Sequence, residues 1–84
     1  MRVEFYGVSR QRAGRPEMDV RASTLGELLT ILSAEMPSLS ELIDGDSLHP
    51  ALVASLNGDR FVKDPRTPLA EHDCVLIISA DAGG

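Results

Sequence analysis

Two glycines at the end of the sequence, Gly83 and Gly84, are the residues whose type and position most suggest chemistry. They follow Ala80, Asp81 and Ala82, so no side chain in this segment is large. Glycine has no Cβ, and its backbone therefore approaches another protein closely and adopts many conformations. A tail of this length reaches roughly 16–18 Å when extended. It could enter a narrow active site and present its terminal carboxylate there.

The carboxylate of Gly84 would need activation, because a carboxylate is a poor electrophile. ATP-dependent adenylation by a partner protein would convert it to a mixed anhydride. A sulfur nucleophile can attack that anhydride, and the product is a thiocarboxylate, a portable sulfide donor. Two terminal glycines are also typical of a frayed chain end. The tail alone therefore leaves both interpretations open.

The remaining titratable residues do not form a recognisable catalytic set. His49 precedes a proline, and His72 lies shortly before the last apolar run, so we expect both to be exposed turn residues without acid–base partners. Cys74 begins that run, and burial would make its thiol an inert packing group. No metal-ligand spacing is present. Two charged clusters are expected to be solvated loops rather than ion-binding sites: Glu41, Asp44 and Asp46, and Arg10, Arg12 and Arg15.

The composition excludes several classes of function. The 84 residues carry a net charge of −5, which argues against nucleic-acid binding through a basic face. A hydrophobic fraction of 43% is ordinary for a single globular domain. No apolar run approaches the roughly 20 residues that span a membrane, and the first residues resemble a strand rather than a signal peptide. We therefore expect a cytoplasmic protein that does not bind membranes.

The hydrophobic pattern predicts strands around one main helix. Thr24 and Glu27 form a capping-box pattern, followed by an apolar stripe that Pro37 ends. Asn57-Gly58 is a strong signal for a two-residue hairpin turn. A shorter helical turn over 39–43 and a loop over 44–46 are also expected. The predicted strands are Val3–Val8, Glu17–Arg21, Leu52–Leu56, Arg60–Val62 and Cys74–Ser79.

This order of elements favours an α+β fold of the β-grasp (ubiquitin-like) type, with one main helix on one face of a mixed sheet of four to five strands. The first and last strands, which are long and apolar, should lie side by side at its centre. We assign residues 1–79 to the β-grasp domain and residues 80–84 to a flexible tail ending in diglycine.

Several segments resemble the MoaD/ThiS family of ubiquitin-like sulfur carriers, and within it the molybdopterin synthase small subunits. The segments are residues 3–8 with the arginines that follow, residues 52–58, Pro68-Leu69 with Asp73 and Val75, and Gly83-Gly84. The resemblance covers essentially the whole chain. It implies a non-enzymatic carrier without a bound cofactor, whose Gly84 is adenylated at the expense of ATP by an E1-like enzyme of the MoeB/ThiF type. Gly83, Ala82 and Asp81 would enter that enzyme with it.

The resemblance also implies a sulfur-accepting partner, such as a molybdopterin synthase large subunit. Carriers of that type usually have two aromatic residues and two prolines before the tail, where this chain has Ile77-Ile78 and Ser79-Ala80. Prolines would stiffen the exit of the tail, so a looser tail is expected here. Delivery of sulfur to thiamine, cysteine, tRNA or secondary-metabolite pathways therefore stays open.

The last strand is apolar on both faces, which is typical of a strand that is central in its sheet or of one whose outer face meets a partner. Either Val75 with Ile77 or Leu76 with Ile78 forms that docking patch. We expect it to be Leu76 and Ile78, together with Phe61. Two other functions remain open: a ubiquitin-like modifier that joins Gly84 to a lysine, and a β-grasp interaction module whose diglycine is incidental.

Overall fold

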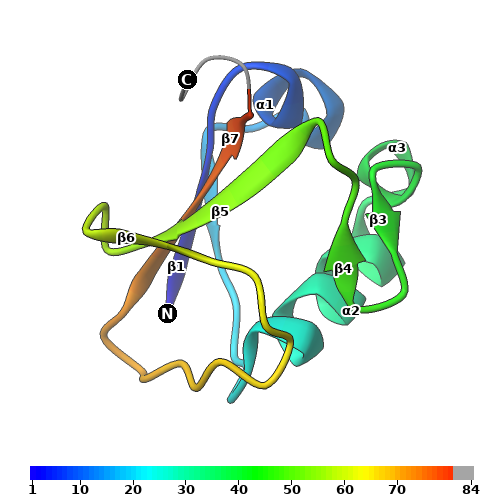
Figure 1. The fold of residues 1–84 in the computed structure, drawn as a ribbon. Helices are drawn as coiled ribbons and strands as arrows, with labels where there is room; N and C mark the ends of the chain where they lie inside the picture. Colours follow the sequence, from blue (N-terminus) through cyan, green and yellow to red (C-terminus); the bar gives the residue numbers. More distant parts are fainter. Residues whose placement is uncertain (81–84) are drawn as a thin grey trace.

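The computed structural model describes residues 1–80, and the predictions for Asp81, Ala82, Gly83 and Gly84 lie outside these residues. Within the described part, one main sheet packs against a long helix, and a small second hairpin lies beside that helix (Figure 1). The elements in chain order are β1 Arg2–Phe5, α1 Val8–Ala13, β2 Glu17–Asp19, α2 Leu25–Glu35, α3 Pro37–Ser40, β3 Ile43–Asp44, β4 Ser47–Leu48, β5 Leu52–Leu56, β6 Arg60–Val62 and β7 Cys74–Ser79.

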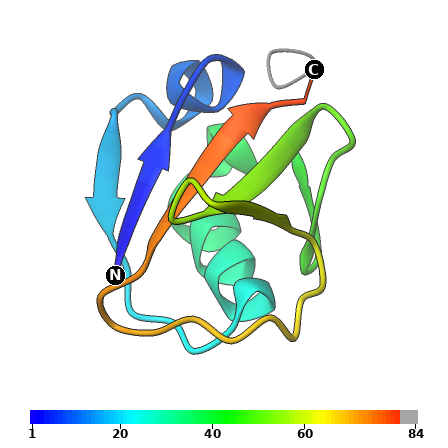
Figure 2. The same cartoon turned by 60° about the vertical axis from the view of Figure 1, so that its left-hand side comes forward.

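The main sheet has five strands in the order β2-β1-β7-β5-β6. β1 and β7 are parallel neighbours, whereas the other neighbouring pairs are antiparallel. α2 crosses one face of this sheet, which we call the inner face, and none of the helices within residues 1–80 lies on the opposite face (Figures 1 and 2). The predicted β-grasp fold, with the first and last strands adjacent, is confirmed.

The core lies between α2 and the inner face of the sheet. Strand residues alternate between the two faces, and the inward ones on β1 and β7 are fully buried. The apolar stripe of α2 covers them, and helix and strands together exclude water from one continuous cluster. Its most deeply buried members are Val3, Phe5, Leu25, Leu28, Leu29, Leu32, Leu39, Val75 and Ile77.

Local signals in the sequence are visible as contacts. The Thr24 hydroxyl accepts the N–H of Glu27 at 3.2 Å, and the Glu27 carboxylate accepts the N–H of Ser23 at 3.1 Å. The first bond satisfies an amide group that the first turn of α2 leaves free, and the second fixes the residue that precedes the N-cap.

Asn57 and Gly58 both have positive φ (58° and 71°), and the N–H of Asp59 donates to the carbonyl of Leu56 at 3.0 Å, so the expected tight turn is present. Leu56 pairs with Arg60, however, so the loop between β5 and β6 runs from Asn57 to Asp59 and is one residue longer than the two-residue loop predicted.

Three other expectations about local structure were wrong. The strand predicted over Glu17–Arg21 ends at Asp19. Val3–Val8 is not one strand, because β1 ends at Phe5 and Val8 begins α1, a helix inside the segment predicted as a loop. Gly7, at φ 59°, breaks the strand, and Gly14 ends the helix in the left-handed conformation. The predicted loop 44–46 turns the chain between β3 and β4, so Ile43 belongs to a strand and not to a helical turn.

Candidate functional site

The structure places the start of the C-terminal segment at one end of the central strand β7. Ser79, the last residue of β7, pairs with Leu52 of β5. The N–H of Ala80 then donates to the carbonyl of Ala51 at 2.8 Å. The backbone is therefore held by hydrogen bonds up to Ala80, the first residue that we had assigned to the tail.

α1 supports the same end of β7 from the other side, next to β1 (Figure 2). The Ser9 side chain is fully buried, and its hydroxyl donates to the carbonyl of Ile77 at 2.7 Å while accepting the N–H of Tyr6 at 3.1 Å. The Val8 N–H points at the Ser79 hydroxyl at 3.5 Å. α1 thus ties the last residues of β7 to the end of β1.

Sequence reasoning missed α1 and the role of Ser9. The available signal was the spacing of Gly7 and Gly14 around six residues that include good helix formers. The arginines here also have structural contacts. Arg10 donates to the carbonyl of Phe5 at 3.1 Å, and Arg12 pairs with Glu41 at 3.2 Å. These contacts attach α1 to β1 and to the segment after α3.

Replacing Ser9 by Ala should destabilise the fold by about 1–3 kcal/mol, because it removes a donor and an acceptor from a site that water does not reach. Chemical denaturation by urea measures this change. The control is Ser38→Ala, an exposed serine of α3 that should change stability by less than about 0.5 kcal/mol. Equal stability of the two variants would show that the Ser9 hydrogen bonds contribute nothing.

The outer face of the sheet carries an apolar patch over three neighbouring strands. Leu76 and Ile78 of β7 point to this face, because Val75 and Ile77 are buried in the core. Leu76 lies opposite Ser55 of β5, and Ser55 lies opposite Phe61 of β6. We call the apolar residues on this face the outer-face patch: Val53, Phe61, Leu76 and Ile78.

Phe61 is the most exposed large apolar side chain of the described residues, at 64% of its surface. Leu76 and Ile78 are half-buried. An apolar face that no helix covers is a common site of protein contact. The geometry therefore agrees with the choice of Leu76 and Ile78 over the alternating pair, and their role in docking stays a prediction.

A polar cluster borders the outer-face patch on β1. Arg2 pairs with Glu4 at 3.0 Å, and the Tyr6 hydroxyl donates to the same carboxylate. The Tyr6 hydrogen bond lowers the pKa of Glu4, and the same bond raises the pKa of Tyr6. Cys74, across from Arg2, is half-buried rather than fully buried, and burial is the main reason that the pKa of its thiol is raised. A thiol held protonated is a poor nucleophile.

The other candidates for acid–base or metal chemistry lie apart from one another. His49 accepts the N–H of Ala51 through Nδ1 at 3.0 Å, and His72 is exposed. Residues 1–80 contain no group of three or more His, Cys, Asp or Glu side chains that could hold a metal ion. In the same residues, no helix has the length and apolar character needed to cross a bilayer. Within this part of the chain, the outer-face patch and the end of β7 are the features that could serve a carrier.

Asp73 holds the turn that leads into β7. Its carboxylate accepts the N–H of Ala70 at 2.7 Å and the side-chain amide of Asn57 at 3.0 Å, and Asn57 in turn accepts the N–H of Cys74 at 2.8 Å. These bonds join the β5–β6 turn to the start of β7. The hydrogen bond from Ala70, followed by the one from Asn57, lowers the pKa of Asp73.

The lowered pKa predicts how an Asp73→Asn variant responds to pH. A carboxylate whose pKa is lower in the folded state stabilises the fold above its unfolded pKa of about 3.9, and it loses this effect as the pH falls through the folded value. The variant should therefore be less stable than the parent at neutral pH, and the difference should shrink below about pH 4. Thermal unfolding from pH 3 to pH 7 tests this. A difference that stays constant with pH would contradict it.

No family model matches this sequence, and no curated protein matches it. Solved structures do match. The small archaeal modifier protein 1 from Methanosarcina acetivorans aligns with a TM-score of 0.79 at 23% identity, covering 99% of this chain and 94% of that chain. One chain of the BexX/CysO complex from Amycolatopsis orientalis aligns with a TM-score of 0.78 at 19% identity, and the alignment covers 99% of this chain and 98% of that chain. One chain of the complex of subunits 1 and 2 of molybdopterin-converting factor from Helicobacter pylori aligns with a TM-score of 0.70 at 25% identity. This alignment covers 99% of this chain and 96% of that chain.

These matches agree with the β-grasp, ubiquitin-like fold assigned above. They also agree with the resemblance expected from the sequence, because the match at 25% identity is to the complex of molybdopterin-converting factor subunits. Two of the three were solved as complexes that contain a partner protein.

Proposed function

We propose that this chain is a sulfur carrier whose reacting group is the carboxyl of Gly84. The observation that carries the proposal is the connection between the fold and the tail. The central strand β7 of a ubiquitin-like domain is fixed by hydrogen bonds up to Ala80, and only four small residues separate it from the Gly84 carboxyl. A rigid domain with such a tail can dock on one enzyme and place its end inside that enzyme.

The chemistry would occur in two steps on a partner of the E1-like adenylating class. The Gly84 carboxylate attacks the α-phosphorus of ATP, and pyrophosphate leaves to give an acyl-adenylate. A sulfide equivalent then attacks the carbonyl carbon, the bond to AMP breaks, and a thiocarboxylate remains. We assign the catalysis of both steps to the partner, and to this chain the reacting carboxyl of Gly84.

The outer-face patch is the surface that we assign to the docking of this partner. β7 contributes Leu76 and Ile78 to the patch and also leads into the tail. A protein that covers the patch is therefore positioned to receive the chain beyond Ala80. Apolar area near the centre of an interface dominates binding energy, and the exposed ring of Phe61 is the natural anchor.

Molybdopterin biosynthesis is the pathway in which we expect the thiocarboxylate to donate its sulfur. Support comes from the likeness to the complex of molybdopterin-converting factor subunits. Ser79 and Ala80 stand where carriers of that type are expected to have prolines. Here two hydrogen bonds restrain this segment instead: the Val8 N–H donates to the Ser79 hydroxyl, and the Ala80 N–H donates to the carbonyl of Ala51. The second candidate function is a protein modifier, which the likeness to small archaeal modifier protein 1 supports.

The proposal is tested with the purified chain, ATP and the adenylating enzyme encoded by the same organism. ATP–pyrophosphate exchange that depends on the chain, followed by thiocarboxylate formation when sulfide is supplied, is the expected result. Branched lysine peptides in cell extracts, without thiocarboxylate, would favour the modifier. A chain that supports neither exchange nor conjugation would exclude both functions.

A further inference from the structure

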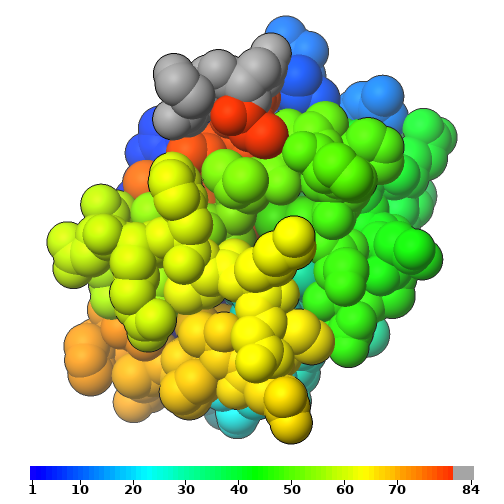
Figure 3. Space-filling view, viewed as in Figure 1, coloured from blue at the N-terminus to red at the C-terminus, as the bar shows by residue number. Residues whose placement is uncertain are grey.

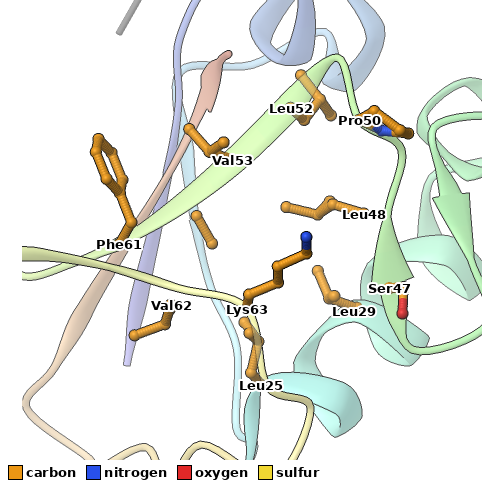
Figure 4. Close-up of a pocket in the computed structure, with 11 residues that line it drawn as sticks. Leu25, Leu29, Ser47, Leu48, Pro50, Leu52, Val53, Phe61, Val62 and Lys63 are labelled. Atoms are coloured by element: carbon orange, nitrogen blue, oxygen red, sulfur yellow. The ribbon is translucent and has the colours of Figure 1, made fainter. Parts of the chain in front are cut away.

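A separate apolar pocket opens between the sheet and the β3–β4 hairpin, away from the polar cluster on β1 (Figure 4). Its volume is about 330 Å³, which is at the lower end for pockets that bind a ligand. Side chains of α2, β4 and β5 converge on it, and the segment after β6 lies against β4 and β5 at its mouth (Figure 3). The residues that matter here are Leu25, Leu29, Leu48, Leu52, Val62 and Lys63.

Lys63 is the only charged residue among those that line the pocket, and it is also the only lysine in the sequence. Its side chain reaches across the pocket toward Leu48 and Leu29 (Figure 4). The ion pairs within residues 1–80 are Arg2–Glu4, Arg12–Glu41 and Arg66–Asp64, so none of the carboxylates in this part of the chain pairs with Lys63. An apolar pocket with a lysine at its edge fits an apolar group that carries one negative charge.

We infer that this pocket, which we call the Lys63 pocket, receives an apolar side chain of a partner protein that is followed by Asp or Glu. The apolar side chain would contact Leu29 and Leu48, and the carboxylate would pair with the Lys63 ammonium group. The Lys63 pocket shares Val53 and Phe61 with the outer-face patch, but the inferred occupant would contact Leu29, Leu48 and Lys63, which lie outside that patch. Its binding requires no chemistry at Gly84.

Two observations favour a protein segment over a free small molecule. The pocket is continuous with the exposed apolar face to which we assign protein docking, because Val53 and Phe61 line it and also belong to the outer-face patch. It also begins next to the end of β7, since Leu52 lines the pocket and pairs with Ser79. A partner that holds the C-terminal end of β7 would therefore reach the Lys63 pocket without moving any element of the fold.

NMR titration of the full ¹⁵N-labelled chain tests the inference with two peptides. The probes are acetyl-Gly-Leu-Asp-Gly-amide and the same peptide with Asn in place of Asp. The Asp peptide should shift the amide signals of Leu29, Leu48 and Lys63, and it should bind about three- to fivefold more tightly than the Asn peptide, as for a partly exposed ion pair. This preference should disappear in 1 M salt, where screening is strong.

Variants and a competitor make the result specific. Lys63→Gln should remove the preference for the Asp peptide, whereas Arg66→Gln, which changes an exposed cation outside the pocket, should keep it. Equal binding of the two peptides, no binding, or shifts confined to the outer-face patch would overturn the inference. Octanoate that binds the same residues more tightly than the Asp peptide would also overturn it, because the pocket would then be a site for small amphiphiles.

Discussion

Deletion of Gly84 is expected to abolish ATP–pyrophosphate exchange and thiocarboxylate formation while leaving the fold intact. The variant would end at Gly83, and its carboxylate would stop about 3.5 Å short of the normal position. A displacement of only 1 Å at a reacting centre costs about 100-fold in rate, so activity should fall by at least that factor. The exchange rate with saturating chain and adenylating enzyme measures the effect.

The interpretation of that deletion depends on stability. The hydrogen bonds and the core described here involve residues up to Ala80, so the thermal midpoint of the deletion variant should equal that of the parent. Ser38→Ala, an exposed change on α3, serves as the active control. A deletion variant that is fully folded and retains its exchange activity would contradict the assignment of Gly84 as the reacting residue.

Replacement of Leu76 by Arg should have the second largest effect, by weakening the complex with the adenylating enzyme. A charge in the middle of the outer-face patch would be buried without a partner in that complex. Central apolar positions of interfaces commonly contribute 2 kcal/mol or more, so the KM for the chain should rise about 30-fold or more. kcat should change little once the chain is saturating, because Gly84 itself is unaltered.

The matched control for Leu76 is Ile31→Arg. Both side chains are half-buried and apolar, but Ile31 belongs to α2, on the other side of the sheet. Circular dichroism and thermal unfolding establish that each variant is folded before kinetics are compared. If both variants raise KM equally, or if neither does, then the outer-face patch is not the docking surface.

The sequence predicted those parts of the fold that depend on local chemistry. β5, β6 and β7 have the expected bounds, and Asn57-Gly58 located the turn between β5 and β6 because both residues accept positive φ. The hairpin register was not predicted, since Leu56 pairs with Arg60 and Asp59 is an additional loop residue. Thr24 and Glu27 located the start of α2 through hydrogen bonds between near neighbours. By contrast, α1 depends on Ser9 bonding to Ile77, which is 68 positions away. No window of neighbouring residues contains that contact.

In the candidate site as well, local patterns could be predicted from the sequence, whereas contacts between distant segments could not. Alternation along Cys74–Ser79 separates Leu76 and Ile78 from Val75 and Ile77, but only the packing of α2 decides which pair is buried. The Lys63 pocket could not be predicted at all. Its lining comes from α2, β4, β5 and the end of β6, and periodicity within any one of these elements indicates only a core position.

The central claim is that the Gly84 carboxyl carries sulfur, and intact-mass measurement of the chain purified from its native cells tests it most directly. The account predicts a species that ends at Gly84 and has one oxygen replaced by sulfur. Treatment with a thiol-alkylating reagent should then add one group at the C-terminal glycine, which fragmentation distinguishes from Cys74. A chain recovered under sulfur-replete conditions with only an unmodified carboxylate, or one that continues beyond Gly84, would contradict the account.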